Sequence, residues 1–169
     1  MAKIESVQEL FEHGLRYVYD CEQKLVKKGL PGMIEAAFDT ELRRALERHL
    51  QETRMQVGRL ERVFTACGLK ADAEDNDVLD EMTKAAEKMI KAIEAPEVRD
   101  AAVIVSGNQV EHYEMATYGS LIAFAEQLGF SEAVTLLRET LQEEKAADAK
   151  LTQIAETSVN ARANQRRAA

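Results

Sequence analysis

The sequence predicts an all-α protein with four long amphipathic helices in one domain. Glycine and proline account for only 8 and 2 of 169 residues, while residues of high helix propensity, such as alanine, leucine, glutamate and lysine, dominate. Apolar residues recur with a period near 3.6 at about residues 6–28, 40–67, 97–127 and 131–157. A chain of this length can bury a sizeable core, so we expect these four segments to pack as a bundle.

Turn and capping residues separate the predicted helices. KKGLPGM is expected to end the first helix, with a short helical piece near MIEAAF after it, and CGLKADAEDND ends the second. Pro96 falls in the first turn of the third helix, and Ser131 is the expected N-cap of the fourth.

The connection between the second and third helices, from Leu69 to Ala95, is long and contains a fifth periodic segment at about residues 76–93. At about 1.5 Å per helical residue and about 3.3 Å per extended residue, it can run the whole length of a bundle of about 40 Å. The second and third helices can then lie parallel, giving two antiparallel hairpins joined by one crossover, as in ferritin-like bundles. An ordinary up-down bundle is the alternative.

Charge and composition argue against several classes of partner. The net charge of −8 disfavours nucleic acid and anionic membranes, because both select clusters of lysine and arginine. No apolar stretch approaches the roughly 20 residues of a membrane span, and MAKIESVQEL lacks the apolar run of a signal peptide. Cys21 and Cys67 provide neither a disulfide framework nor a C-x-x-C site. We therefore expect a cytoplasmic protein.

The bundle domain is expected to span residues 1–158. The polar tail that follows, residues 159–169, is expected to be frayed. A binding arm built on Arg162, Arg166 and Arg167 is the alternative interpretation of this tail.

Helical wheels place seven polar residues on or beside the inward faces of the four helices. Six carry carboxylates and one carries an imidazole: Glu22, His49, Glu52, Glu111, Glu114, Glu144 and Asp148. An inward carboxylate can simply pair with a cation one turn away. Arg48 offers such a pair to Glu52, and Lys145 offers one to Asp148, so these two have an ordinary alternative. The other four lack a local cation. His13 is expected at the surface, and His112 at the surface, at an interface or beside the ligands.

Six buried, unpaired carboxylates would each cost several kcal/mol, against a typical total stability of about 5–15 kcal/mol. Protonation can neutralise some of them, whereas hard cations held by oxygen ligands and one imidazole can neutralise all of them. The pattern therefore predicts a two-metal site for iron or manganese. Tyr118, at i+4 from Glu114, is expected either to donate a hydrogen bond to a ligand carboxylate or to be an ordinary core tyrosine.

Four segments resemble the YciF-like bacterial stress proteins, a ferritin-like family. They cover nearly the whole chain, in order: YVYDCEQKLVKKGLP, LERHLQETRMQVGRLERVF, NQVEHYEMATYGSLIAFAEQLG and LLRETLQEEKAADAKLTQIAE. The resemblance implies a ferritin-like bundle, a homodimer, a rubrerythrin-like metal site and a role in bacterial stress responses, with no established reaction.

Two helices depart from the usual di-iron pattern, in which two helices each supply a Glu and two supply Glu-x-x-His. The second reads His49-x-x-Glu52, in reversed order, and the fourth reads Glu144-x-x-x-Asp148, without histidine. Two functions therefore stay open. One is a di-iron or di-manganese protein that handles peroxide, dioxygen or iron under stress. The other is a non-enzymatic structural or binding helical homodimer.

Overall fold

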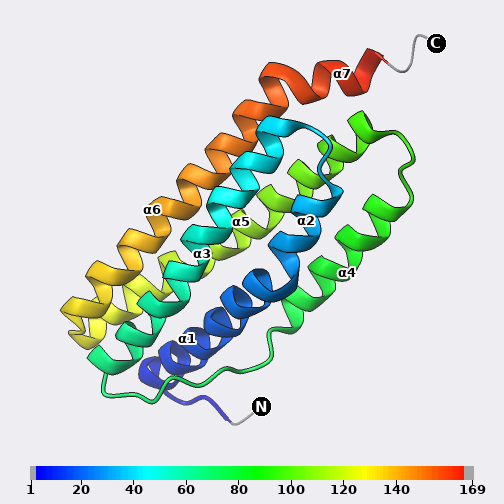
Figure 1. Cartoon of the computed structure of the whole chain (residues 1–169). Helices are drawn as coiled ribbons and strands as arrows, with labels where there is room; N and C mark the ends of the chain where they lie inside the picture. Colours follow the sequence, from blue (N-terminus) through cyan, green and yellow to red (C-terminus); the bar gives the residue numbers. More distant parts are fainter. Residues whose placement is uncertain (1–2, 166–169) are drawn as a thin grey trace.

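The computed structural model describes residues 3–165, which form a bundle of long helices (Figure 1). The bounds are α1 Val7–Lys24, a π-helical turn Leu25–Gly29, α2 Leu30–Ala36, α3 Thr40–Ala66, α4 Asp77–Lys91, α5 Pro96–Leu128, α6 Ser131–Ile154, a second π-helical turn Ala155–Val159 and α7 Asn160–Gln165. No helix among the described residues is long and apolar enough to cross a membrane.

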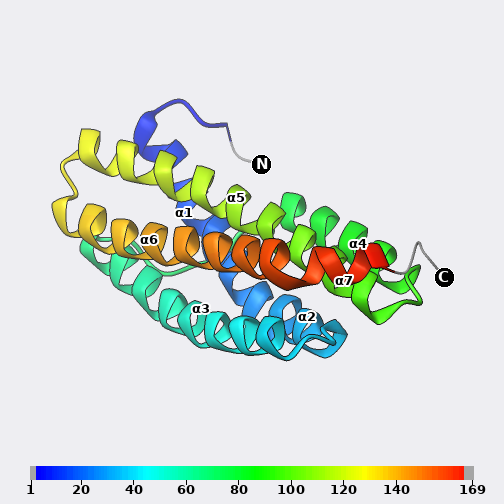
Figure 2. The same cartoon turned by 90° about the horizontal axis from the view of Figure 1, so that it is seen from above.

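The topology is that of a ferritin-like bundle. α3 and α5 begin at the same end of the molecule and run in the same direction, while α1 and α6 run the opposite way (Figure 1). The crossover between α3 and α5 carries α4 back along the bundle, where α4 packs against α5 (Figure 2). The predicted crossover with an extra helix is therefore confirmed, and the ordinary up-down alternative is excluded.

Side chains at the helix starts satisfy free backbone donors. Asp39 caps α3 by accepting from the N–H of Leu42 at 2.8 Å, and Asn76 caps α4 by accepting from the N–H of Leu79 at 2.9 Å. Pro96 opens α5, as predicted. Ser131 is the first residue of α6, and Phe130 takes the N-cap position, so the predicted N-cap was wrong by one residue.

The predicted break at KKGLPGM is wrong. The first helix continues through the π-helical turn Leu25–Gly29 into α2, and Pro31 lies in the first turn of α2. A π turn widens the helix by one residue and so accommodates a proline that has no N–H to donate.

The predicted frayed tail also needs correction where the structure describes it. Val159 is fully buried among apolar side chains of the bundle. Arg162, in α7, forms an ion pair with Asp39 at the start of α3. These two contacts attach the segment to the bundle up to Gln165. Arg166 and Arg167 lie outside the described residues.

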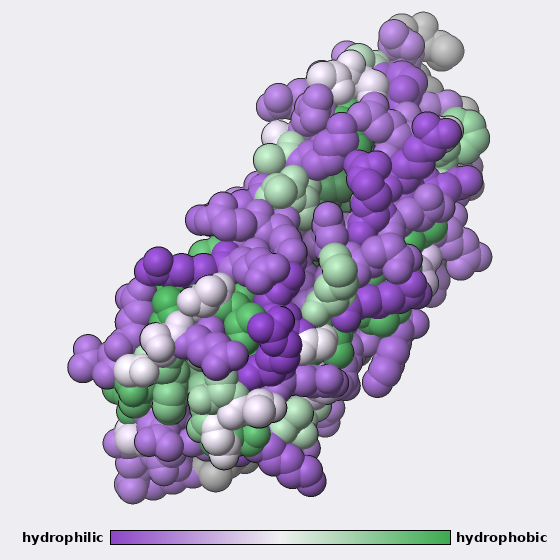
Figure 3. Space-filling model, turned by 60° about the vertical axis from the view of Figure 1, so that its left-hand side comes forward, coloured by the Kyte–Doolittle hydropathy of each residue, from purple (hydrophilic) through white to green (hydrophobic). Residues whose placement is uncertain are grey.

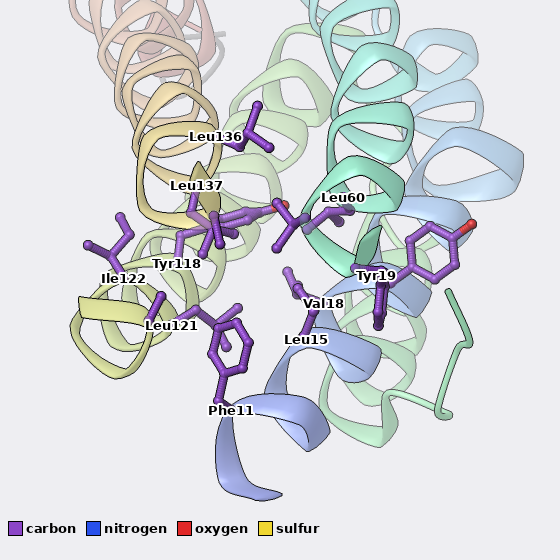
Figure 4. Packing of buried hydrophobic residues seen from close by; sticks show 14 residues of the cluster. Phe11, Leu15, Val18, Tyr19, Leu60, Tyr118, Leu121, Ile122, Leu136 and Leu137 are labelled. Carbon is purple, nitrogen blue, oxygen red and sulfur yellow. The ribbon is translucent and has the colours of Figure 1, made fainter. Parts of the chain in front are cut away.

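A polar layer divides the apolar core into two clusters. The first cluster lies toward the start of α1 and includes Phe11, Leu60 and Leu121, among the side chains in Figure 4. The second lies toward the other end of the bundle and includes Leu42 and Ile154. On each long helix, buried polar residues stand between the parts that feed the two clusters. The fold thereby brings polar groups from all four helices to one level.

Candidate metal centre

Four of the predicted carboxylates meet in this polar layer. Glu22 comes from α1, Glu111 and Glu114 from α5, and Glu144 from α6, and their exposed fractions are 0–3%. Their helices are held on both sides of the layer by the two apolar clusters. The carboxylates therefore cannot reach bulk water without disrupting the core.

His49 supplies the one imidazole in this layer, from α3. Its Nε2 lies 3.1 Å from Oε1 of Glu111 and 3.7 Å from Oε2 of Glu144. One ligand atom from each of these three residues can be chosen so that all lie within 4.8 Å of one another. The three side chains come from three different helices and converge on a common centre.

Two neutral side chains hydrogen-bond to the buried carboxylates. The Tyr118 hydroxyl donates to Oε1 of Glu22, so the predicted hydrogen bond to one of these carboxylates is present. The Cys21 thiol donates to Oε1 of Glu114 at 3.6 Å. Both residues are fully buried. The spacing of Cys21 in the sequence bears only on disulfide and C-x-x-C sites, so it gave no sign of this contact.

Several carboxylate oxygens in the cluster have no partner. Among residues 3–165, Glu22, Glu111 and Glu114 each keep one buried oxygen without a hydrogen bond, and Glu144 keeps both. No lysine or arginine in this range forms an ion pair with any of the four, and His49 is their one basic neighbour within 4 Å. Buried polar atoms without partners are rare in folded proteins. A bound cation would supply the missing partner, so the donor set fits a metal.

The cluster shifts the titration of its own members. Burial raises the pKa of Glu22 to about 7, although the hydrogen bond from Tyr118 opposes this effect. Burial and the neighbouring carboxylates raise the pKa values of Glu114 and Glu144 well above their usual range. Burial alone would lower the pKa of His49, but the charge of Glu111 outweighs it and raises that pKa well above its usual value. Without metal, the cluster therefore retains protons at neutral pH.

The remaining two predicted ligands lie at the rim of the cluster. The Glu52 side chain is 42% exposed, and its Oε2 lies 3.4 Å from Nδ1 of His49. Its hydrogen bond with His49 lowers the pKa of Glu52. The Asp148 side chain is 23% exposed, and its Oδ1 lies 3.2 Å from Nε2 of the exposed His112. Both carboxylates face histidines, and both are less deeply buried than the other four.

His13 differs from its prediction. It is partly buried, and its Nδ1 lies 2.9 Å from Oε2 of Glu74 in the crossover. The helical wheel correctly placed it away from Glu22, but could not show that the crossover covers this face of α1.

A second polar network adjoins the cluster and was missed from the sequence. Arg59 of α3 donates to Thr140 at 2.9 Å and to Glu143 at 2.7 Å, both on α6. Gln56, fully buried, also donates to Glu143 at 2.9 Å. Arg59 is thus neutralised by Glu139 and Glu143 and forms no ion pair with the four buried glutamates.

Comparison with known proteins supports the relationship suggested by the sequence. A family model described as a domain of unknown function, DUF892, matches residues 6–164. Protein YciF of Escherichia coli K12 is 38% identical over 161 residues, which cover 95% of this chain and 96% of YciF.

Solved structures share the fold. The structure of the E. coli stress protein YciF matches with a TM-score of 0.88 and 38% identity, over 93% of this chain and 99% of that one. YcfI from Rhodopseudomonas palustris, provisionally described as a structural protein, matches with a TM-score of 0.86 and 41% identity, over 89% and 95%. A protein from Xanthomonas campestris, 20% identical, has a TM-score of 0.71 over 96% and 99% of the two chains and shows the fold alone.

Proposed function

The chain belongs to the DUF892 family, and we propose that its buried cluster binds two iron ions, with manganese as the alternative metal, in a cytoplasmic stress-protective role. The stress role follows from the description of the E. coli relative YciF as a stress protein. The metal role rests on the cluster itself. Small oxidants or ferrous iron are the substrates that such a site would take.

One observation carries the metal proposal. Four glutamates with 0–3% exposure share one layer. Each keeps at least one buried oxygen without a hydrogen bond, and the one basic group within ion-pair distance of any of them in the described chain is His49, beside Glu111 and Glu144. Without a metal, these glutamates stay buried by retaining protons, as the raised pKa values of Glu22, Glu114 and Glu144 indicate. A bound cation would replace those protons as the compensating charge. Oxygen ligands with one nitrogen suit iron and manganese.

Each residue of the cluster would have a distinct role at the metal. Glu22, Glu111, Glu114, Glu144 and His49 would hold the metal, and Glu52 and Asp148 would complete its coordination from the rim. Bound iron would supply one-electron chemistry toward peroxide or dioxygen. Tyr118 fixes one oxygen of Glu22, which leaves the other free for the metal. The two apolar clusters flank the layer on both sides.

Metal analysis tests the proposal. Protein grown with both iron and manganese and purified without chelators should carry up to two ions per chain, and Glu114→Ala should lose most of them. Glu47→Ala, on the exposed side of α3, is the matched control and should keep the wild-type content. Less than about 0.2 equivalents of any transition metal in the wild type would reject the metal role.

A structural or binding role is the second candidate, because several large apolar side chains are exposed. Phe38 is 63% exposed, Met55 57% and Val105 50%. Apolar residues also gather toward the lower end of the face in Figure 3. The description of YcfI as a structural protein points the same way. Turnover of peroxide or dioxygen by the metal-loaded protein would decide for the enzyme, whereas metal content alone would not.

A further inference from the structure

The crossover leaves a pocket of about 600 Å³ between α4, α5 and the segment formed by the first π-helical turn and α2. Its apolar lining includes Leu25, Met33, Met82, Ile90 and Val110. None of its lining residues is a predicted metal ligand. The pocket is therefore separate from the carboxylate cluster.

Two features of the sequence keep this pocket open. Leu79 is the one residue of α4 that is fully buried. Met82, Ala86 and Ile90, each one helical turn from the next, are only half-buried and line the pocket. On the opposite wall, a Cβ atom added to Gly32 would meet nothing within 4 Å. The absent side chain at Gly32 thus leaves space that the facing stripe of α4 does not fill.

The rim of the pocket is more basic than the protein as a whole. Lys28, Lys91 and Arg99 line it against Glu35 and Glu87, an excess of one positive charge in a chain whose net charge is −8. Glu87 forms ion pairs with two lysines. Its Oε1 lies 2.8 Å from Nζ of Lys28, and its Oε2 lies 3.8 Å from Nζ of Lys91. An anionic group at the rim would meet a positive charge that the protein does not fully balance.

We propose that this pocket binds a small amphipathic anion, whose apolar body lies against the α4 stripe and whose carboxylate, sulfonate or phosphate group lies at the Lys28–Lys91 rim. The volume falls within the range of about 300–1,000 Å³ typical of small-molecule sites, and an apolar lining with a few polar groups is their usual composition. One wall is a π-helical turn, a feature often found at functional sites.

Direct binding tests this assignment on the full-length protein. Calorimetry with dodecanoate should show saturable binding of one molecule per chain, and dodecanol, which lacks the charge, should bind at least tenfold more weakly. Gly32→Leu places a side chain in the open space at this wall of the pocket and should weaken dodecanoate binding at least tenfold. Gly58→Leu is the matched control, because its Cβ also meets nothing within 4 Å and it lies on α3 outside the pocket, so its affinity should stay unchanged.

Charge and assembly provide two further readouts. Lys91→Gln should weaken dodecanoate binding severalfold while leaving dodecanol unaffected. Absence of saturable binding in the wild type, or equal losses in Gly32→Leu and Gly58→Leu, would overturn the proposal. It would also be overturned if Gly32→Leu reduced the mass measured by light scattering, since the pocket would then be part of a contact between two copies of the chain.

Discussion

Nε2 of His49 on α3 lies 3.1 Å from Oε1 of Glu111 on α5, inside the bundle. α3 and α5 are the parallel helices joined by the crossover, so no hairpin brings these two residues together. Among the described residues, His49 is the one basic group within ion-pair distance of the buried glutamates. The contact therefore governs the charge balance of the metal-free core.

Replacing His49 should destabilise the metal-free protein. His49→Gln removes the imidazolium that faces Glu111 and Glu144, and loss of one partner from a buried ion pair costs about 3–5 kcal/mol. Protonation of the glutamates will recover part of this cost, so we expect a loss of about 2 kcal/mol in urea unfolding at pH 7. His112→Gln, at an exposed histidine, should change stability by less than about 0.5 kcal/mol. Equal stability of His49→Gln and wild type would contradict this role.

The Tyr118 hydroxyl should control the titration of Glu22. Its hydrogen bond opposes the rise in the pKa of Glu22, so Tyr118→Phe should raise that pKa further above about 7. It should also cost about 1–3 kcal/mol at pH 8, where the ionised Glu22 loses its donor. Tyr19→Phe is the matched control, because Tyr19 donates to the exposed Glu61 at 2.9 Å. A larger loss in Tyr19→Phe, followed by the same urea unfolding, would contradict the assignment.

The overall fold was predictable because helical periodicity and connection length are local properties of the sequence. The crossover was long enough to allow parallel helices, although an up-down bundle stayed open, and α4 appeared as its own periodic segment. Two local sequence signals led to wrong predictions, one about the end of the first helix and one about the C-terminal tail. Gly29 and Pro31 normally end a helix, yet a π turn carries the chain through them. The polar composition of the tail also gave no sign that Arg162 pairs with Asp39, because Asp39 lies 123 residues earlier in the sequence.

The buried part of the candidate site was predictable for the same reason. Glu22, Glu111, Glu114 and Glu144 lie on apolar stripes without a local cation, and a helical wheel identifies both properties. Local cations already set Glu52 and Asp148 apart from these four. The sequence could not show that their partners are His49 and His112 rather than Arg48 and Lys145. It also could not reveal Cys21 or Arg59, because their partners lie on other helices.

The docked tail should contribute measurable stability. Val159 is fully buried, so Val159→Ala should lower the unfolding free energy by about 2 kcal/mol through lost apolar contact and an unfilled cavity. The exposed neighbour Asn160 provides the control, and Asn160→Ala should leave the melting temperature within about 1 °C of the wild type. Indistinguishable melting of Val159→Ala and wild type would mean that the tail does not pack in solution.

The protein should be a homodimer at micromolar concentration. This expectation comes from the family resemblance, and exposed Phe38, Met55 and Val105 offer apolar surface for an interface. Light scattering should return twice the chain mass of 18.9 kDa. A mass that stays near 18.9 kDa over a concentration series would contradict it.

Stability of the metal-free protein should fall as the pH rises from about 5 to about 8. Burial raises the pKa of Glu22 from 4.5 to about 7, and burial raises the pKa values of Glu114 and Glu144 well above their usual range. Each group binds its proton more readily in the folded state, so its contribution is complete below about 4.5 and is lost as the pH rises toward the folded pKa. For Glu22 alone this amounts to on the order of 3 kcal/mol. The raised pKa of His49 acts in the same direction.

Melting temperatures between pH 5 and pH 8, with and without Fe(II) or Mn(II), measure this dependence. Glu22→Gln should flatten the metal-free profile and raise stability at pH 8, because the amide keeps an acceptor for Tyr118 without the charge, whereas Glu47→Gln should leave it unchanged. Metal at a hundredfold excess over its Kd should restore about 2.7 kcal/mol to the wild type at neutral pH. A metal-free protein that gains stability steadily over this range and ignores both ions would contradict the metal site, because glutamates that are stable as anions need no cation.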